Sequence, residues 1–155
     1  MKNLILIFLV LGFVTNGLFA QNLKQLIPLP ESYQEGNGFF PLGKGTRIVV
    51  PDSGAWTDVT TWNELLNQVY GFRLYPAWEK TDEGNYIVLE RKPVGGNPAE
   101  AYKLSVKPDA VEVMGDGSGL FYALISLLQL IEVRDGNYVI PCCTIADEPR
   151  FLWRG

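Results

Sequence analysis

The sequence predicts an α+β fold in which a mostly antiparallel sheet packs on two helices. Short apolar runs, two longer stretches with helical periodicity, and connections short enough for hairpins carry this prediction. The chain has 155 residues, of which 47% are hydrophobic. That length is sufficient for one domain with an ordinary core.

Residues 1–20 predict a secretory signal peptide. Lys2 provides a basic start, residues 4–14 are apolar, and the small Ala20 precedes the polar Gln21. The continuous apolar run is shorter than the roughly 20 residues of a membrane-crossing helix. We therefore expect cleavage between Ala20 and Gln21, export to the periplasm or beyond the cell, and no membrane attachment of the mature chain.

The first strands are expected around glycine turns. Ile27-Pro28-Leu29-Pro30 is an extended lead-in, because a proline disfavours helix at the residue before it. Gly36-Asn37-Gly38 predicts a turn. Strands are expected at residues 39–42 and 46–50, on either side of a second turn at Gly43-Lys44-Gly45.

An amphipathic helix is expected at residues 55–70, where apolar side chains recur at intervals of three and four. Asp52 or Ser53 can cap its start, and Gly71 can end it.

Strands then follow at residues 72–75, 86–90, 101–106 and 110–114, the last two forming a hairpin. A second helix at residues 119–133 has little polar face and must be buried on most sides. A final strand at residues 138–140 is expected to end at Pro141.

Charge and missing residue types exclude several function classes. The chain carries 13 basic and 17 acidic residues, a net charge of −4, and no more than two basic residues are consecutive. Nucleic-acid and membrane-surface binding are therefore not expected. The absence of histidine removes histidine-dependent nucleophilic catalysis and histidine-ligated zinc. We expect no metal site and no cofactor.

The two cysteines, Cys142 and Cys143, are adjacent. Their Cα atoms are about 3.8 Å apart across a trans peptide, below the usual range for a disulfide. A bond between them would be strained. Because neighbours in a strand point to opposite faces, we expect one buried thiol and one nearer the surface.

The segment Gly115-Asp116-Gly117-Ser118-Gly119 lies between a predicted strand and a predicted helix, with Asp135 twenty residues after Gly115. This arrangement brings a dinucleotide-binding turn into consideration. The glycine spacing lacks the third glycine of that motif. We interpret the segment as a turn in which Ser118 or Asp116 caps a buried helix.

Two adjacent acidic pairs, Asp82-Glu83 and Asp147-Glu148, are candidates for the paired carboxylates of a glycosidase. Neighbouring side chains in an extended chain diverge, whereas the catalytic carboxylates converge on a sugar. We interpret both pairs as parts of turns.

Aromatic residues would suit stacking on sugars. The four tryptophans are Trp56, Trp62, Trp78 and Trp153. Trp62 has the spacing of a helical core residue, whereas Trp78 lies in a polar loop and is the best surface candidate.

The C-terminal segment Ile145-Ala146-Asp147-Glu148-Pro149-Arg150-Phe151-Leu152-Trp153-Arg154-Gly155 resembles the entry to the catalytic barrel in family 20 glycoside hydrolases, the β-N-acetylhexosaminidases. Three further motifs resemble that family's N-terminal domain in the same order: Ile27-Pro28-Leu29-Pro30 with Gly38-Phe39-Phe40, Glu100-Ala101-Tyr102-Lys103-Leu104, and Gly119-Leu120-Phe121-Tyr122-Ala123 with Leu128-Gln129-Leu130.

The resemblance implies a non-catalytic domain at residues 21–145 and the start of a (β/α)8 barrel at residues 146–155. The rest of such a barrel, which takes about 250 residues, is missing from this chain, and the family's catalytic Asp-Glu pair lies beyond it. No catalytic residue is therefore assigned. Arg154 corresponds to an arginine whose planar guanidinium binds sugar hydroxyls.

We therefore expect an accessory-domain fragment of an exported β-N-acetylhexosaminidase, inactive on its own. Its partners would be the catalytic barrel of the same polypeptide and, through that barrel, N-acetylhexosamine glycans. The alternative is a free-standing carbohydrate-binding or interaction module that uses its exposed aromatic residues.

Overall fold

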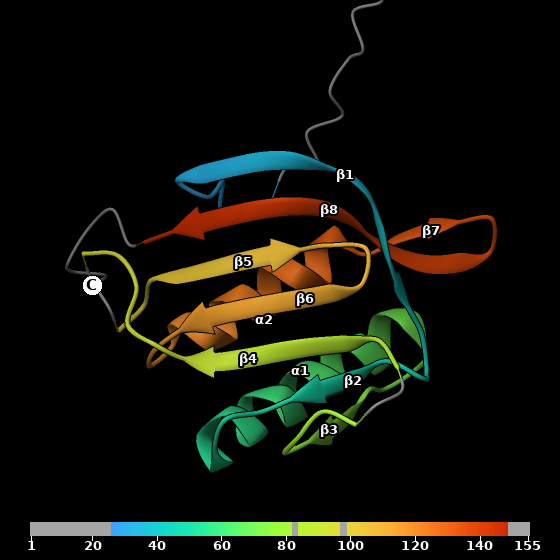
Figure 1. Cartoon of the computed structure of the whole chain (residues 1–155), viewed down its shortest axis with the longest axis horizontal. Helices are drawn as coiled ribbons and strands as arrows, with labels where there is room; N and C mark the ends of the chain where they lie inside the picture. Colours follow the sequence, from blue (N-terminus) through green and yellow to red (C-terminus); the bar gives the residue numbers. More distant parts are fainter. Residues whose placement is uncertain (1–25, 82–83, 97–98, 149–155) are drawn as a thin grey trace, which may run out of the picture.

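The computed structural model of the chain describes residues 26–81, 84–96 and 99–148. In these ranges the chain forms one sheet of eight strands and two helices (Figure 1), so the α+β class is confirmed. In chain order the elements are β1 (Ser32–Leu42), β2 (Arg47–Val49), α1 (Ser53–Tyr70), β3 (Tyr75–Ala77), β4 (Tyr86–Arg91), β5 (Tyr102–Val106), β6 (Ala110–Gly115), α2 (Gly119–Leu130), β7 (Glu132–Arg134) and β8 (Asn137–Asp147).

The sheet is mixed, with the strand order β1-β8-β5-β6-β4-β2-β3 and β7 paired to β8. The pairs β1–β8, β5–β8, β5–β6 and β7–β8 are antiparallel, whereas β2–β3, β2–β4 and β4–β6 are parallel. The prediction of a mostly antiparallel sheet is thus only partly correct. Helix α1 connects β2 to β3. A helical crossover of this kind lets the second strand run parallel to the first, as β2 and β3 do.

Both helices cover the same face of the sheet, the far side in Figure 1, and the core lies between the two layers. Trp62 of α1 is fully buried, and its indole Nε1 donates to the carbonyl oxygen of Leu124 in α2 at 2.6 Å. Leu120, Leu124 and Leu127 of α2 are also fully buried. Neither helix in the described part of the chain is long and apolar enough to cross a membrane.

Local signals set the ends of α1. The Asp52 carboxylate accepts from the backbone N–H of Ala55 at 2.9 Å, and Gly71 ends the helix in the left-handed conformation with φ 77°. Helix α2 ends at Leu130 rather than at residue 133, because β7 starts two residues later. The predicted α1 cap and stop are therefore confirmed, and the predicted end of α2 is three residues too late.

The predicted turn at residues 36–38 is wrong, because β1 runs through it. The register of β1 against β8 shifts between Glu35 and Phe39, and the extra residues form an irregularity of the bulge type. Gly36 passes so close to β8 that a Cβ there would lie 3.1 Å from the carbonyl oxygen of Cys142. Gly38 has φ 95°, which favours glycine.

The predicted end of the last strand at Pro141 is also wrong. Strand β8 continues to Asp147. Proline, which has no backbone N–H, is tolerated at position 141 because β8 is paired there on one side only. Pairing with β7 ends at Val139 and pairing with β5 begins at Cys143, so at Pro141 only β1 lies alongside.

The strand predicted at residues 72–75 begins only at Tyr75. The backbone of Leu74 instead pairs with a side chain of α1. Asn63 accepts from its N–H at 2.8 Å and donates to its carbonyl oxygen at 2.9 Å. This side-chain pairing occupies backbone groups that a strand would use.

Candidate functional site

The glycine-rich turn before α2 is a packing element. A Cβ at Gly119 would lie 2.2 Å from the carbonyl oxygen of Ala101, and one at Gly117 would lie 2.6 Å from that of Ala99. The N–H of Ser118 donates to the same Ala99 oxygen at 2.9 Å. Backbone thus fills the space that a dinucleotide pyrophosphate would need, and the interpretation as a turn is confirmed.

The predicted helix cap in this turn is only partly correct. Ser118 occupies the N-cap position of α2, but its side chain makes no capping hydrogen bond. The carboxylate of Asp116 accepts from the N–H of Gly117 at 2.8 Å, so it orders the turn rather than the first helical residues.

Arg91, at the end of β4, joins the starts of both helices. Its Nε donates to Asp52 Oδ2 at 2.5 Å, and a second guanidinium nitrogen donates to Asp116 Oδ1 at 3.3 Å. Hydrogen bonds from Arg91 and from the N–H of Ala55 lower the pKa of Asp52 to about 2, and the two carboxylates raise that of Arg91. One guanidinium thus pairs with two carboxylates and links the starts of the two helices, so this cluster has a role in the fold.

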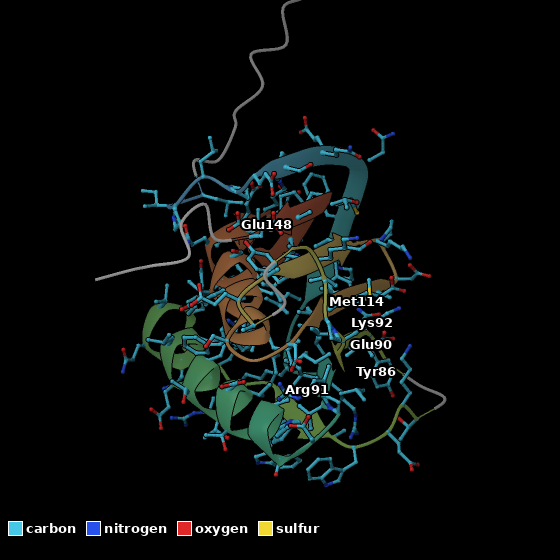
Figure 2. All side chains as sticks on the ribbon, turned by 90° about the vertical axis from the view of Figure 1, so that its left-hand side faces the viewer. Tyr86, Glu90, Arg91, Lys92, Met114 and Glu148 are labelled. Carbon is cyan, nitrogen blue, oxygen red and sulfur yellow. The ribbon has the colours of Figure 1, made fainter. Side chains whose placement is uncertain are left out.

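Asp147 and Glu148 accept hydrogen bonds from different backbone segments, although both residues line one cavity. Asp147, the last residue of β8 rather than part of a turn, accepts from the N–H of Glu31 at 3.1 Å. Glu148 accepts from the N–H of Gly96 at 2.6 Å. Figure 2 shows Glu148 well apart from Arg91. Each carboxylate holds a different segment, which gives both residues a structural role.

Several predicted residues lie outside the described ranges. They are Ala20 and Gln21 at the expected cleavage point, the acidic pair Asp82-Glu83, and Trp153 and Arg154 near the C-terminus.

Both cysteines are buried, which corrects the expectation that one lies nearer the surface. Cys142 is 3% and Cys143 is 2% exposed, and neither forms a disulfide. The glycines of β1 cover Cys142: a Cβ at Gly36 would lie 3.2 Å from its Cβ. Burial raises the pKa of Cys143 to about 12. Its thiol therefore stays protonated at neutral pH and is a poor nucleophile.

The tryptophans divide as the sequence predicts. Trp62 is fully buried, whereas Trp78 is 57% exposed. The structure adds a partner that the sequence did not indicate, because the ring of Trp78 stacks on that of Trp56 in α1. The ring centroids are 4.7 Å apart and the planes are inclined by 28°.

A cavity of about 140 Å³ lies between the lead-in, α2 and the end of β8. It is lined by Ile27, Pro28, Glu100, Tyr102, Tyr122, Ile125, Ser126, Gln129, Asp147 and Glu148. The side-chain amide of Gln129 bonds both backbone groups of Ile27, at 2.9 and 3.1 Å. At this volume the cavity is smaller than the roughly 300 Å³ of a typical ligand pocket.

The polar groups of this cavity are engaged in structure. The Tyr102 hydroxyl lies 2.7 Å from Ser126 Oγ, and burial raises the pKa of Tyr102 to about 12. Among the described residues, no three acidic or thiol side chains are grouped to hold a metal ion.

Ile27, Tyr122 and Ile125 are apolar residues that line this cavity, and together they are here called the α2 outer surface. Ile27 is 75% exposed, and the two α2 residues are half-buried. Exposed apolar surface of this kind is typical of contact sites. Glu148, the last described residue, lines the same cavity, so the chain leaves the domain beside this surface.

Comparison with known proteins gives consistent matches. Residues 23–148 match the family model described as glycosyl hydrolase family 20, domain 2. A β-hexosaminidase of Vibrio furnissii is 30% identical over 131 residues, which cover 84% of this chain and 20% of that protein. A lacto-N-biosidase of Bifidobacterium bifidum is 26% identical over 130 residues, covering 83% of this chain and 12% of that protein.

Solved structures agree with these matches. The GH20 β-N-acetylhexosaminidase of Streptomyces coelicolor superposes with a TM-score of 0.71 at 26% identity, covering 84% of this chain and 28% of that one. The GH20 exo-β-N-acetylglucosaminidase of Vibrio harveyi gives a TM-score of 0.71 at 25% identity, covering 84% and 20%. The chain thus spans about a fifth of the length of the curated β-hexosaminidase it matches.

Proposed function

Because the chain belongs to glycosyl hydrolase family 20, in which it corresponds to domain 2, we propose that it is the N-terminal accessory domain of an exported β-N-acetylhexosaminidase. The observation that carries the proposal is the match over residues 23–148. In the longer protein, hydrolysis of terminal N-acetylhexosamine residues would be carried out by a (β/α)8 barrel that follows this domain.

The charges of the domain support a non-catalytic role. Glycosidases need two carboxyl groups about 5–9.5 Å apart around the scissile bond, with one pKa raised so that the group can donate a proton. Here Asp147 and Glu148 each accept from the backbone of a different segment, and Asp52 and Asp116 both pair with Arg91. All four carboxylates thus have hydrogen-bond or ion-pair partners within the domain.

The α2 outer surface is the site at which we propose that the barrel docks. It exposes Ile27, and Glu148 lines the adjoining cavity, so a domain that continues from the chain after Glu148 starts beside this surface. Burying Ile27 there would contribute to docking, since removing apolar area from water stabilises by about 25 cal/mol per Å².

We propose that Arg154 contributes to the substrate site of the barrel. Its guanidinium would donate to hydroxyl oxygens of the terminal sugar once the barrel surrounds it. Binding that is equal in the ground and transition states lowers KM without raising kcat.

The proposal is tested with an aryl N-acetyl-β-glucosaminide, assayed on the chain and on a longer polypeptide extended through whatever reading frame follows Gly155. We expect hydrolysis only by the longer polypeptide, with Arg154→Ala acting mainly on KM. Mass spectrometry of the exported product should find a chain that starts at Gln21.

Two outcomes would overturn this function. An inactive longer polypeptide would favour the free-standing carbohydrate-binding module. Activity of the short chain that is lost in Asp147→Asn or Glu148→Gln would move catalysis into this domain.

A further inference from the structure

Trp78 is a large apolar side chain that the fold holds at the surface. It is 57% exposed, while its ring stacks on Trp56 with centroids 4.7 Å apart. Since Trp56 covers one face of the Trp78 ring, the exposed area comprises the other face and the ring edges. The pair therefore offers one flat aromatic face to solvent.

The segment that carries Trp78 is fixed on both sides. Before it, the carbonyl oxygen of Ala77 accepts from the N–H of Val50 at 3.0 Å. After it, the Tyr86 hydroxyl accepts from the N–H of Thr81 at 2.8 Å and donates to the carbonyl oxygen of the same residue at 2.8 Å. The ring is thus positioned before any ligand arrives, which lowers the entropic cost of binding.

Exposed polar residues follow each tryptophan in the sequence. On α1, Thr57 and Thr60 are exposed, and after Trp78 both Glu79 and Lys80 are exposed. The apolar core of a protein–protein interface is depleted of charged residues. A flat aromatic ring followed by exposed hydroxyl and charged residues fits a pyranose better, because the C–H face of the sugar packs on the electron-rich ring face and its hydroxyl rim meets polar groups.

We propose that the Trp56–Trp78 pair is a glycan-binding site, at which a pyranose ring of an N-acetylhexosamine chain packs on the exposed face of Trp78. The choice of N-acetylhexosamine rests on the proposed function. The stacking itself depends only on the geometry of the two tryptophans. In the enzyme this site would hold a glycan on the accessory domain and so raise its concentration near the barrel.

The test is a binding isotherm of the purified chain on insoluble chitin, a polymer of β-linked N-acetylglucosamine, with cellulose as the comparison polymer. We expect saturable binding to chitin that Trp78→Ala weakens about tenfold, while Trp78→Tyr keeps most of it. The matched control is Val133→Ala, since Val133 is 62% exposed in β7 and carries no aromatic ring. Circular dichroism melts establish that each variant is folded.

Three results would overturn the site: no saturable binding of the wild-type chain to chitin, equal binding by wild type and a folded Trp78→Ala, or equal losses in Trp78→Ala and Val133→Ala. Self-association that Trp78→Ala abolishes would also overturn it, in favour of a second copy as the partner. Because the isotherm uses no hydrolysis, its failure is distinguishable from failure of the proposed enzymatic function.

Discussion

Replacing Gly119 by alanine tests whether the glycine turn before α2 is a packing element. The added Cβ would lie 2.2 Å from the carbonyl oxygen of Ala101, which is backbone and cannot rotate away. Ala101 is 1% exposed and leads into β5. Relief of the clash therefore requires a shift of the first turn of α2 or of the start of β5.

The magnitude follows from two opposing effects. Overpacking costs about 1–3 kcal/mol, occasionally more, and backbone contact on this scale places Gly119→Ala at the upper end. The better helix propensity of alanine returns at most about 1 kcal/mol. We expect a net loss of about 2 kcal/mol in the free energy of unfolding, large against the 5–15 kcal/mol of a typical domain.

Urea unfolding followed by tryptophan fluorescence measures this loss. The matched control is Gly45→Ala, where a Cβ would meet nothing within 4 Å, so its effect should stay within about 0.5 kcal/mol. If Gly119→Ala is as stable as Gly45→Ala, α2 does not pack closely against residue 101. The interpretation of the turn as a packing element would then be wrong.

Three further predictions concern the core, a helix cap and the alkaline limit of stability. Leu127→Asp should unfold the domain, because a fully buried leucine would become an unpaired charge costing several kcal/mol; a wild-type circular dichroism melt would place α2 outside the core. Asp52→Ala should cost about 1 kcal/mol in urea unfolding, through loss of the cap on Ala55, whereas Asp52→Asn, which keeps an acceptor oxygen, should cost less. The pKa of Cys143 is about 12 in the fold against 9.0 for an ordinary thiol, so its stabilising contribution is full below pH 9 and is lost as the pH rises from 9 to 12. Melting temperatures should fall over that range, less steeply in Cys143→Ala, and equal slopes would contradict the burial of the thiol.

The sequence predicts best the features that depend on neighbouring residues. Apolar spacing predicts α1, and both Asp52 and Gly71 are found where the helix begins and ends, because capping and the left-handed stop involve only residues within one turn. The same holds for the tryptophans: helical spacing predicts the burial of Trp62, and the polar loop predicts the exposure of Trp78.

Features that depend on distant partners were not predictable in this way. Glycine and proline normally indicate turns, yet residues 36–38 lie inside β1 and Pro141 lies inside β8, because each faces a strand far away in the chain. Strand direction leaves no local signal, so the parallel half of the sheet was missed. Arg91 is 39 residues from Asp52, and no spacing rule joins them.

The candidate sites follow the same division. The sequence shows that Asp147 and Glu148 are adjacent acidic residues. Only the fold shows their partners, which are the backbone N–H groups of Glu31 and Gly96. The burial of Cys142 depends on glycines of a neighbouring strand. The cavity beside α2 draws its lining from several separate segments and has no signature in any one of them.

One substitution, made in two polypeptides, tests whether the α2 outer surface docks on a catalytic barrel. Ile27 is 75% exposed in the chain, so Ile27→Asp should change its unfolding free energy by no more than about 0.5 kcal/mol. In the longer polypeptide the same aspartate would be buried at the domain contact and should cost about 2 kcal/mol or more. Val133→Asp, at a residue 62% exposed in β7, should be neutral in both. Equal, small effects of Ile27→Asp in the two polypeptides would contradict the docking.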